Sequence, residues 1–462
     1  MLIEPVIRAQ LNAQRLGDKR LDSRCSQVQQ QLINGNSSQS FPQLFNQPYQ
    51  LKAVYRLLNN PKLTPQAIQK GYQRGMLEWA RKQPKNQHYW FVFQDSTFGK
   101  YHNHSLELGY IQNADDNGLL LHHAILTDDQ FVPLGLPIQT FVVRDRAEYG
   151  KREERKKRPF ADKESAKWIA ALDWARRFGR QSGRHLIQVC DREADINEVI
   201  NYALTSRQHF IIRSNHDRRL QDSALTLSSY EQRLGIGQIT QRVLRDSQGK
   251  THSCSCQIRY GRVYLTGLDK AINVVYLHQL DPIKDQKLAH WTVLTSLPVS
   301  DLSDATAVLD GYCHRWPTCE DFHKCLKSGC SIEDRHLHSQ EALFGAISLL
   351  SLVAISLLRL RHLAVGVPDS PVESVVEPDE QVVATQLSGR YLTKTDKTHC
   401  EPGSILWFVL LLARLGGHQG IRQAGLPGWQ TIWRGYRQFS LLVDGYRMSK
   451  NEYYVQKPPT YG

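Results

Sequence analysis

Cysteine is scarce in this sequence, and its placement lacks the spacings of disulfide frameworks and zinc fingers. Nine cysteines are spread over 462 residues, which is an odd number in a long chain. Disulfide frameworks are typical of small secreted domains, so none is expected here. Cys313, Cys319, Cys325 and Cys330 cluster, but their spacings of six, six and five residues match no common zinc pattern. We therefore expect packing thiols.

The sequence also lacks internal repeats and an apolar segment at its start. Residues 1–10, MLIEPVIRAQ, have no apolar core of the length that a secretory signal needs. The one long apolar stretch, residues 343–360, contains Arg359 and several serines, and further basic residues follow at once. A fully buried helix explains this composition better than a membrane span. We expect a cytoplasmic protein that uses no membrane and, in a bacterium, associates with the nucleoid.

Acidic residues are too few to balance the basic ones. The chain has 58 Lys+Arg against 45 Asp+Glu, a formal net charge of +13. This excess favours an anionic partner, with nucleic acid first. At 41% hydrophobic residues, the chain can bury sizeable cores, which excludes extensive disorder. Its length predicts about two to four domains.

Apolar periodicity divides the chain into helical ends and a strand-rich middle. Residues 1–80 have helical spacing, and residues 81–191 contain apolar runs typical of buried strands. Short β-like runs fill residues 192–288, where we expect a separate β-rich unit. Strand and then helical patterns return in residues 289–365. Residues 366–462 begin with a proline- and acid-rich linker and continue as helices.

Three acids occupy positions from which they can converge. Asp95 follows the run WFVFQ and Asp191 follows LIQVC, so two predicted strands end in aspartate, and Glu320 lies on a predicted helix. Three neighbouring carboxylates repel one another and take up protons unless a cation neutralises them. Carboxylate oxygens suit magnesium, and two such ions support phosphodiester cleavage. Each acid taken alone is better explained as a turn former or helix cap, and the surrounding residues change that balance.

Motifs along almost the whole chain resemble one family. YCHRWPTCEDFHKCLK, residues 312–327, resembles the Tyr-Arg-Glu-Lys signature of the bacterial DDE transposases of insertion-sequence family four. VCDREAD at 189–195, QDST at 94–97 and HWTVLTSLPV at 290–299 are also similar to that family. So are LGDKRLDSR near one end and GWQTIWRGYRQFSLLVDGY near the other. Within the family, the likeness is to the hairpin-forming, cut-and-paste group of transposon five.

The resemblance implies an α/β fold with a ribonuclease-H-like mixed-sheet core and a β-rich insertion. It implies an N-terminal helical domain that binds transposon ends and a C-terminal helical domain that dimerises. It also implies that Asp95, Asp191 and Glu320 are the catalytic acids, which hold two Mg²⁺ ions that Mn²⁺ can replace. The family's DNA contacts fall on Tyr312, Arg315, Lys324, Lys327, Trp291, Arg213, Arg20 and Arg24.

The activity that follows from the resemblance is magnesium-dependent DNA transposition. A homodimer would bind the terminal inverted repeats in double-stranded DNA, nick them, form hairpins and join the freed ends to target DNA. Lys and Arg neutralise phosphates, and an aromatic ring such as Trp291 stabilises a flipped base by roughly 1–3 kcal/mol. Structural interpretations stay open: Trp291 as core packing, Arg213 as a solvated strand residue, and Arg20 and Arg24 as a solvated helix face.

The signature departs from the family pattern at one point. The family places three residues between its arginine and glutamate, whereas four separate Arg315 from Glu320. Without a gap, the acid position falls on Cys319. One extra residue turns the rest of a helix by about 100°, which a π-bulge or a break at Pro317 would absorb. Asp321 is the fallback acid. Two alternatives remain: a catalytically impaired relative acting as a DNA-binding repressor, and a ribonuclease-H-like nuclease without strand transfer.

Overall fold

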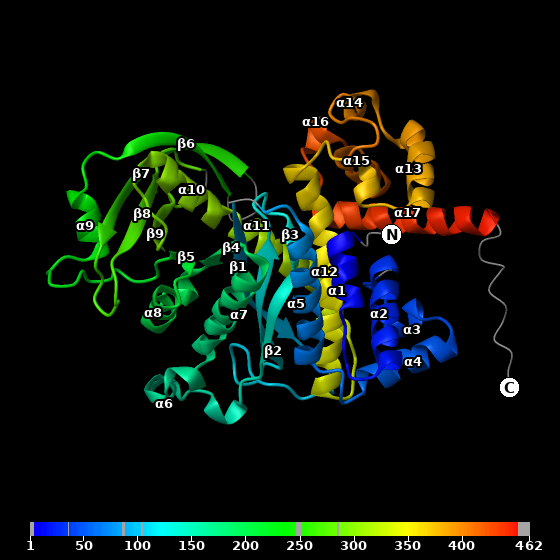
Figure 1. Cartoon of the computed structure of the whole chain (residues 1–462), viewed down its shortest axis with the longest axis horizontal. Coiled ribbons are helices and arrows are strands. Elements are labelled where there is room, and N and C mark those ends of the chain that lie inside the picture. The colour runs from blue at the N-terminus through cyan, green and yellow to red at the C-terminus, as the bar shows by residue number, and fades with distance from the viewer. Residues whose placement is uncertain are drawn as a thin grey trace.

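A nine-stranded sheet runs through the computed structural model of the protein, which describes residues 4–35, 37–85, 88–102, 105–245, 251–283 and 286–450 (Figure 1). The strand order is β3-β2-β1-β4-β5-β9-β8-β7-β6. The strands are β1 (Tyr89–Lys100), β2 (Gly118–Thr127), β3 (Pro133–Val142), β4 (His185–Cys190), β5 (His209–Arg213), β6 (Gln238–Arg245), β7 (Thr251–Val263), β8 (Ile272–Gln279) and β9 (His290–Thr295).

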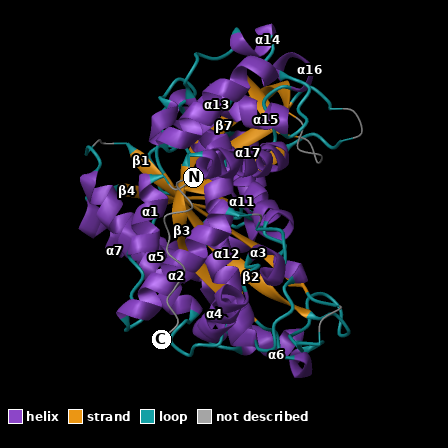
Figure 2. Ribbon diagram, turned by 90° about the vertical axis from the view of Figure 1, so that its right-hand side faces the viewer, coloured by secondary structure: helices purple, strands orange, loops and turns teal. Residues whose placement is uncertain are grey.

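The first five strands form the expected mixed core. β1, β2 and β3 are antiparallel neighbours, whereas β4 pairs parallel with β1 and β5 pairs parallel with β4. Every residue of β2 is buried, as expected for a strand that is covered on both faces. Helices enclose the strands in Figure 2. This is the ribonuclease-H-like arrangement that the resemblance implied.

The region from residue 192 to 288 differs from the prediction. We expected a separate β-rich unit, but β5 lies inside the core sheet beside β4, and β9 then pairs antiparallel with β5. β8, β7 and β6 continue the same sheet outward. The reason is that alternating short apolar runs predict strands without predicting their partners.

Helices cover both faces of the core sheet. The helices from residue 152 to 324 are α6 (Arg152–Lys157), α7 (Lys167–Ser182), α8 (Asn197–Thr205), α9 (Leu227–Arg233), α10 (Leu302–Cys313) and α11 (Arg315–Lys324). Of these, α7, α8, α10 and α11 contact the core strands. Side chains alternate along β1: Trp90 lies near Phe178 of α7, whereas Phe91 lies near Gly311 of α10. Odd-numbered residues of β1 therefore face the side of α10 and α11.

The N-terminal helices pack against the core. They are α1 (Pro5–Asn12), α2 (Lys19–Asn34), α3 (Phe41–Leu44), α4 (Pro48–Leu58) and α5 (Pro65–Lys82). The Thr64 side chain caps α5 by accepting from the Ala67 N–H at 3.1 Å, and Pro65 occupies the first turn, where proline is tolerated. α1 and α5 contact β3, and α2, α4 and α5 contact α12.

The long apolar helix α12 (Gln340–Gly366) is buried, as predicted. Among the described residues it is the helix that is long and apolar enough to cross a membrane, yet 94% of its most apolar window lies inside the fold. Its one buried arginine, Arg359, donates from Nε to Glu4 at 3.1 Å, so the charge is paired. α12 is therefore a core helix around which the N-terminal and C-terminal helices assemble (Figure 1).

The C-terminal region is helical, as expected. It contains α13 (Pro378–Tyr391), α14 (Lys394–Lys397), α15 (Ile405–Leu415), α16 (Ile421–Ala424) and α17 (Trp429–Ser449). The predicted linker before α13 is a packed segment, because Val372 and Val375 are buried in the apolar core. Residues 451–462 of the predicted C-terminal domain lie outside the described part of the chain.

Candidate active site

Asp95 lies within a strand and not at its end, which corrects the prediction. β1 continues to Lys100 through its pairing with β2, where Asp95 is opposite His123. On its other edge, however, the pairing with β4 ends at Phe93 and Val189. Asp95 therefore lies just beyond the last paired residues of the parallel edge, on the face of α10 and α11. Its side chain is buried at 6% exposure.

Asp191 directly follows β4, as predicted, and caps a short 3₁₀ turn. Its carboxylate accepts the Glu193 backbone N–H at 2.9 Å. Burial and then the negative charge of Asp95 raise the pKa of Asp191 to about 6, against the opposing effect of Arg315. The two aspartates therefore share one poorly solvated site at the β1–β4 edge.

Glu320 reaches the same site from α11. Burial raises its pKa, the charge of Asp95 adds to this increase, and Arg315 opposes it. Among the described residues, the carboxylate oxygens of these three acids do not all lie within 4.8 Å of one another. Crowded, desolvated carboxylates are nevertheless the donor type that magnesium prefers, so the residues present fit that ion.

Arg315 balances the acids in this structure. Its Nη1 donates to Oδ2 of Asp95 at 2.5 Å, and both side chains are buried. Burial alone would lower the pKa of Arg315, but Asp95 and then Tyr312 outweigh it and the pKa is raised. The signature arginine is thus held directly against a candidate metal ligand.

The helical signature is interrupted near Pro317, as one form of the prediction required. α10 ends at Cys313 and α11 begins at Arg315, with His314 between them. Pro317 has no N–H to donate to the carbonyl of Cys313, which explains a break one turn earlier. A π-helical turn is also present, but at Cys325–Gly329, after Glu320 and including Lys327.

The two competing positions in the signature face different surroundings. Cys319 is fully buried, and burial followed by the charge of Asp95 raises its thiol pKa well above the usual value. Asp321 pairs with Arg361 of α12 and lies 3.9 Å from Lys324. The fallback acid is therefore committed to another ion pair, and Glu320 is the half-buried acid beside Asp95.

An aromatic and cationic group adjoins the acids. The rings of Trp291 on β9 and Tyr312 on α10 lie 5.6 Å apart at 72°, and the Arg213 guanidinium lies 5.4 Å from the Trp291 ring. Burial lowers the pKa of Arg213, and Tyr312, which accepts a hydrogen bond from it, partly restores it. Trp291 is partly buried against the core, so it can pack and still offer an edge to a ligand.

The remaining predicted DNA contacts divide into two groups. Lys327, in the π-helical turn, lies 3.8 Å from Glu333 and senses the charge of Glu320, so it belongs to the site. Lys324 is mostly exposed on the same helix. Arg20 and Arg24 are exposed on α2, which contacts α1, α4 and α12 and lies apart from β4 and β9 (Figure 1).

Two features escaped sequence reasoning. A cavity of about 1340 Å³ beside Glu193 is lined by basic and acidic side chains together, among them Arg144, Lys167 and Glu164. The density of Lys and Arg near residue 155 was its only signal. The second feature is a group of Glu231, His278 and His290 in the outer half of the sheet. No sequence spacing announced it, because these residues are brought together by strand register.

Comparison with known families agrees with the order of these regions. The Transposase DNA-binding family matches residues 4–63, the Transposase DDE domain matches residues 161–357, and the Transposase Tn5 dimerisation domain matches residues 352–455. Asp191 and Glu320 fall inside the DDE match, whereas Asp95 precedes it. The three matches follow one another as the motifs do, and the chain belongs to the Tn5-like DDE transposases.

Proposed function

We propose that this protein moves its element by cut-and-paste transposition, with Asp95, Asp191 and Glu320 as its catalytic acids. One observation carries the proposal: the charge of Asp95 raises the pKa of both Asp191 and Glu320. These acids come from β1, the end of β4 and α11, so the fold gathers them from segments far apart in sequence. Carboxylates with no structural need to be close are a mark of a functional site.

The same acids would hold two Mg²⁺ ions, for which Mn²⁺ would substitute. Bound there, the ions would supply Lewis acidity, activate the attacking oxygen and neutralise charge on the scissile phosphate. The chain's own part is to present the carboxylates in a partly desolvated pocket. Arg315, which pairs with Asp95 here, would bind a DNA phosphate if a cation neutralised Asp95 in its place, and its planar guanidinium is well suited to phosphate.

Neighbouring side chains would position the DNA. Trp291 would stack on a base flipped out of the hairpin, with Arg213 behind its ring and Tyr312 at its edge. Lys327 and Lys324 would neutralise phosphates next to the cut. Basic side chains of the cavity beside Glu193, such as Arg152 and Lys163, would extend this surface along the duplex.

The proposed reaction proceeds through four in-line substitutions at one site. Water nicks one strand, the new 3′ hydroxyl attacks the opposite strand to form a hairpin, water reopens the hairpin, and the 3′ end joins target DNA. Each step exchanges one phosphodiester oxygen for another, so one set of acids serves them all. Arg20 and Arg24 on α2 would bind the terminal repeats, and α17 would join two protomers into the synaptic complex.

A specific observation favours a second candidate, a DNA-binding repressor with impaired catalysis. Arg315 occupies Oδ2 of Asp95, and the extra residue before Glu320 leaves Cys319 buried beside the aspartates. If the cation cannot displace Arg315, the DNA-binding and dimerisation regions would still work while cleavage fails.

The deciding experiment is cleavage of the element's own end DNA by purified protein, with an Asp191→Ala variant beside it. Nicks and hairpins made by the wild type and absent from the variant are the expected result. Tight binding without cleavage, in Mg²⁺ and in Mn²⁺, would leave the repressor. Cleavage without joined products would leave a ribonuclease-H-like nuclease. A scrambled end sequence controls for binding that is merely electrostatic.

A further inference from the structure

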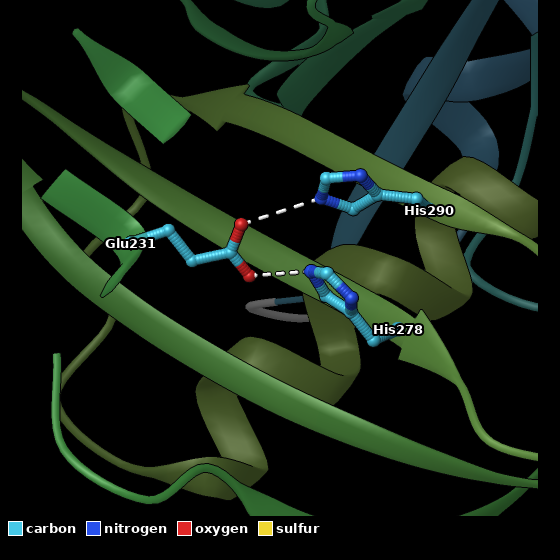
Figure 3. A group of neighbouring side chains, drawn as sticks. All are labelled: Glu231, His278 and His290. Carbon is cyan, nitrogen blue, oxygen red and sulfur yellow. Dashed lines mark hydrogen bonds and ion pairs between the residues drawn. The ribbon is translucent and has the colours of Figure 1, made fainter. Parts of the chain in front are cut away.

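A second group of metal-ligand side chains lies in the outer half of the sheet, away from the three acids. His278 on β8 and His290 on β9 are directly opposite each other in the antiparallel register. Cross-strand partners project to the same face, and their imidazole rings lie 3.9 Å apart. Glu231, from α9, reaches over this face toward both rings (Figure 3). Three elements thus converge on one point.

The geometry is that of ligands aimed at a shared centre. Nε2 of His278 lies 2.7 Å from Oε1 of Glu231, and Nε2 of His290 lies 3.3 Å from Oε2. Within the described part of the chain, this is the group of three His, Cys, Asp or Glu side chains whose ligand atoms all lie within 4.8 Å of one another. Glu231 is buried, whereas His290 is half exposed, so the group is anchored inside and open to solvent on one side.

The charges around the group favour ligation. Arg259, with Nη1 3.4 Å from Oε1 of Glu231, is the nearest permanent positive charge. A neutral imidazole can carry its proton on Nδ1 and leave Nε2 free to bind a metal. The carboxylate has one oxygen for Arg259 and one for a second cation.

We propose that Glu231, His278 and His290 bind Zn²⁺ and that this site is separate from the magnesium site of the acids. Two imidazole nitrogens and one carboxylate select a first-row transition ion over Mg²⁺, which prefers oxygen alone. The exposed side leaves a fourth position for water. The ion would tie α9 to β8 and β9 and hold the outer half of the sheet together.

The site has a consequence for the DNA face of the same strand. His290 and Trp291 are consecutive residues of β9, so their side chains point to opposite faces. Zinc bound at His290 would restrict β9 on one face while Trp291 meets Tyr312 and Arg213 on the other. Metal binding itself does not depend on the proposed transposition chemistry, so failure of one leaves the other standing.

The test is zinc binding by the full-length protein in excess Mg²⁺, which occupies the carboxylates of the acid site. Competition with a chromophoric chelator should show one Zn²⁺ per chain, and Zn²⁺ should raise Tm. Loss of a residue that only supports a metal ligand weakens metal binding roughly 10–100-fold. Loss of a ligand itself, as in His290→Gln or His278→Gln, should weaken zinc binding by more than that. Asp191→Ala and His338→Gln, which changes an exposed histidine outside the group, should bind as the wild type does.

Co²⁺ gives a readout that needs no variant. The wild type should show the visible bands of a tetrahedral site with no thiolate charge-transfer band, because no cysteine is among the proposed ligands. Absence of stoichiometric zinc, full retention by His290→Gln and His278→Gln, or a thiolate band would each overturn the proposal. If no stoichiometric zinc binds, Glu231 and the two histidines are a hydrogen-bonded group with Arg259 as its counter-charge.

Discussion

Arg315 and Asp95 form an ion pair in the interior of the active site, with Nη1 and Oδ2 2.5 Å apart and both side chains no more than 10% exposed. A buried carboxylate needs a positive partner because water does not solvate it. DDE transposase domains generally use divalent metal ions, and we propose that such an ion takes the place of Arg315 beside Asp95 during catalysis. Arg315 neutralises Asp95 here, and its charge also opposes the rise in the pKa of Asp191 and Glu320.

Removing the guanidinium should make stability depend on metal. In Arg315→Met, Asp95 and Asp191 lose their shared counter-charge, and metal-free protein should lose about 3–5 kcal/mol of unfolding free energy, as for a broken buried pair. Mg²⁺ should then raise Tm more in the variant than in the wild type. Denaturant unfolding with and without Mg²⁺ measures both effects.

The matched control is Arg361→Met, which breaks the pair with Asp321 between α11 and α12. It should lower stability without changing the response to Mg²⁺. If Mg²⁺ raises Tm by the same amount in Arg315→Met and in the wild type, Arg315 and the metal do not compete for Asp95.

The register of the signature helix predicts which acid is essential. Glu320→Gln should reduce cleavage more than about a hundredfold, since loss of a ligand exceeds loss of a supporting residue. Asp321→Asn should retain most activity because its carboxylate serves Arg361, and Cys319→Ala should also retain it. Single-turnover nicking of end DNA measures all three variants. Loss of activity in Asp321→Asn but not in Glu320→Gln would mean that α11 is turned by about one residue in the working enzyme.

The gathering of the acids was predictable because each lies in a motif with strong local character. VCDREAD places Asp191 after an apolar strand, and the signature places Glu320 on a helix. The position of Asp95 inside β1 was not predictable in this way. The sequence shows an apolar run that ends at Phe93, but β1 continues because β2 pairs with it as far as Lys100.

Long-range pairing also explains what sequence reasoning missed elsewhere. Residues 192–288 read as strands, but local periodicity contains no information about which edge of a sheet they join. For the same reason the pair of His278 and His290 could not be predicted. These residues are twelve positions apart in sequence and become opposite only through the β8–β9 register. By contrast, α12 needed no partner information, because its composition alone demanded burial.

Trp291 should affect hairpin formation more than the first nick. Stacking of a flipped base contributes about 1–3 kcal/mol, so Trp291→Ala should lower the hairpin-forming rate roughly 5–150-fold. The acids are untouched, so nicking should persist, and Trp291→Phe should retain most hairpin product. Gel analysis of nick and hairpin over one turnover separates the steps. An equal loss of both products in Trp291→Ala would indicate a packing role against Tyr312.

Asp128 should make stability fall as pH rises. Its carboxylate accepts the backbone N–H groups of Val132 at 2.8 Å and Gln130 at 3.0 Å, and burial raises its pKa from 3.8 to about 6. The folded state then binds more protons than the unfolded state between about pH 4 and 6. The stabilisation of the folded state by the protonated Asp128 carboxyl is therefore full below about pH 4 and is lost by about pH 6.

Asp128→Asn should remove that pH dependence and keep both backbone hydrogen bonds through its amide oxygen. At pH 7 the variant should be more stable than the wild type by up to about 3 kcal/mol, which corresponds to a two-unit pKa difference. Urea unfolding at several pH values provides the measurement. Asp269→Asn, at an exposed position, is the control and should leave the pH profile unchanged. A destabilised Asp128→Asn at pH 7 would show that the ionised form is required.

The exposed side of α17 should carry the dimer. The chain matches the Tn5 dimerisation domain there, and Leu441 and Leu442 are 73% and 44% exposed on a helix whose other side packs on α13 and α15. Exposed leucines on an ordered helix cost solubility unless a partner covers them. Leu441→Asp should therefore weaken self-association at least about tenfold, since a buried leucine contributes roughly 1.5–3 kcal/mol, while folding is unaffected because the side chain lies outside the core. Sedimentation with and without end DNA measures this self-association.

Leu426→Asp, at a similarly exposed leucine before α17, is the control. Equal dimerisation by both variants would place the interface elsewhere.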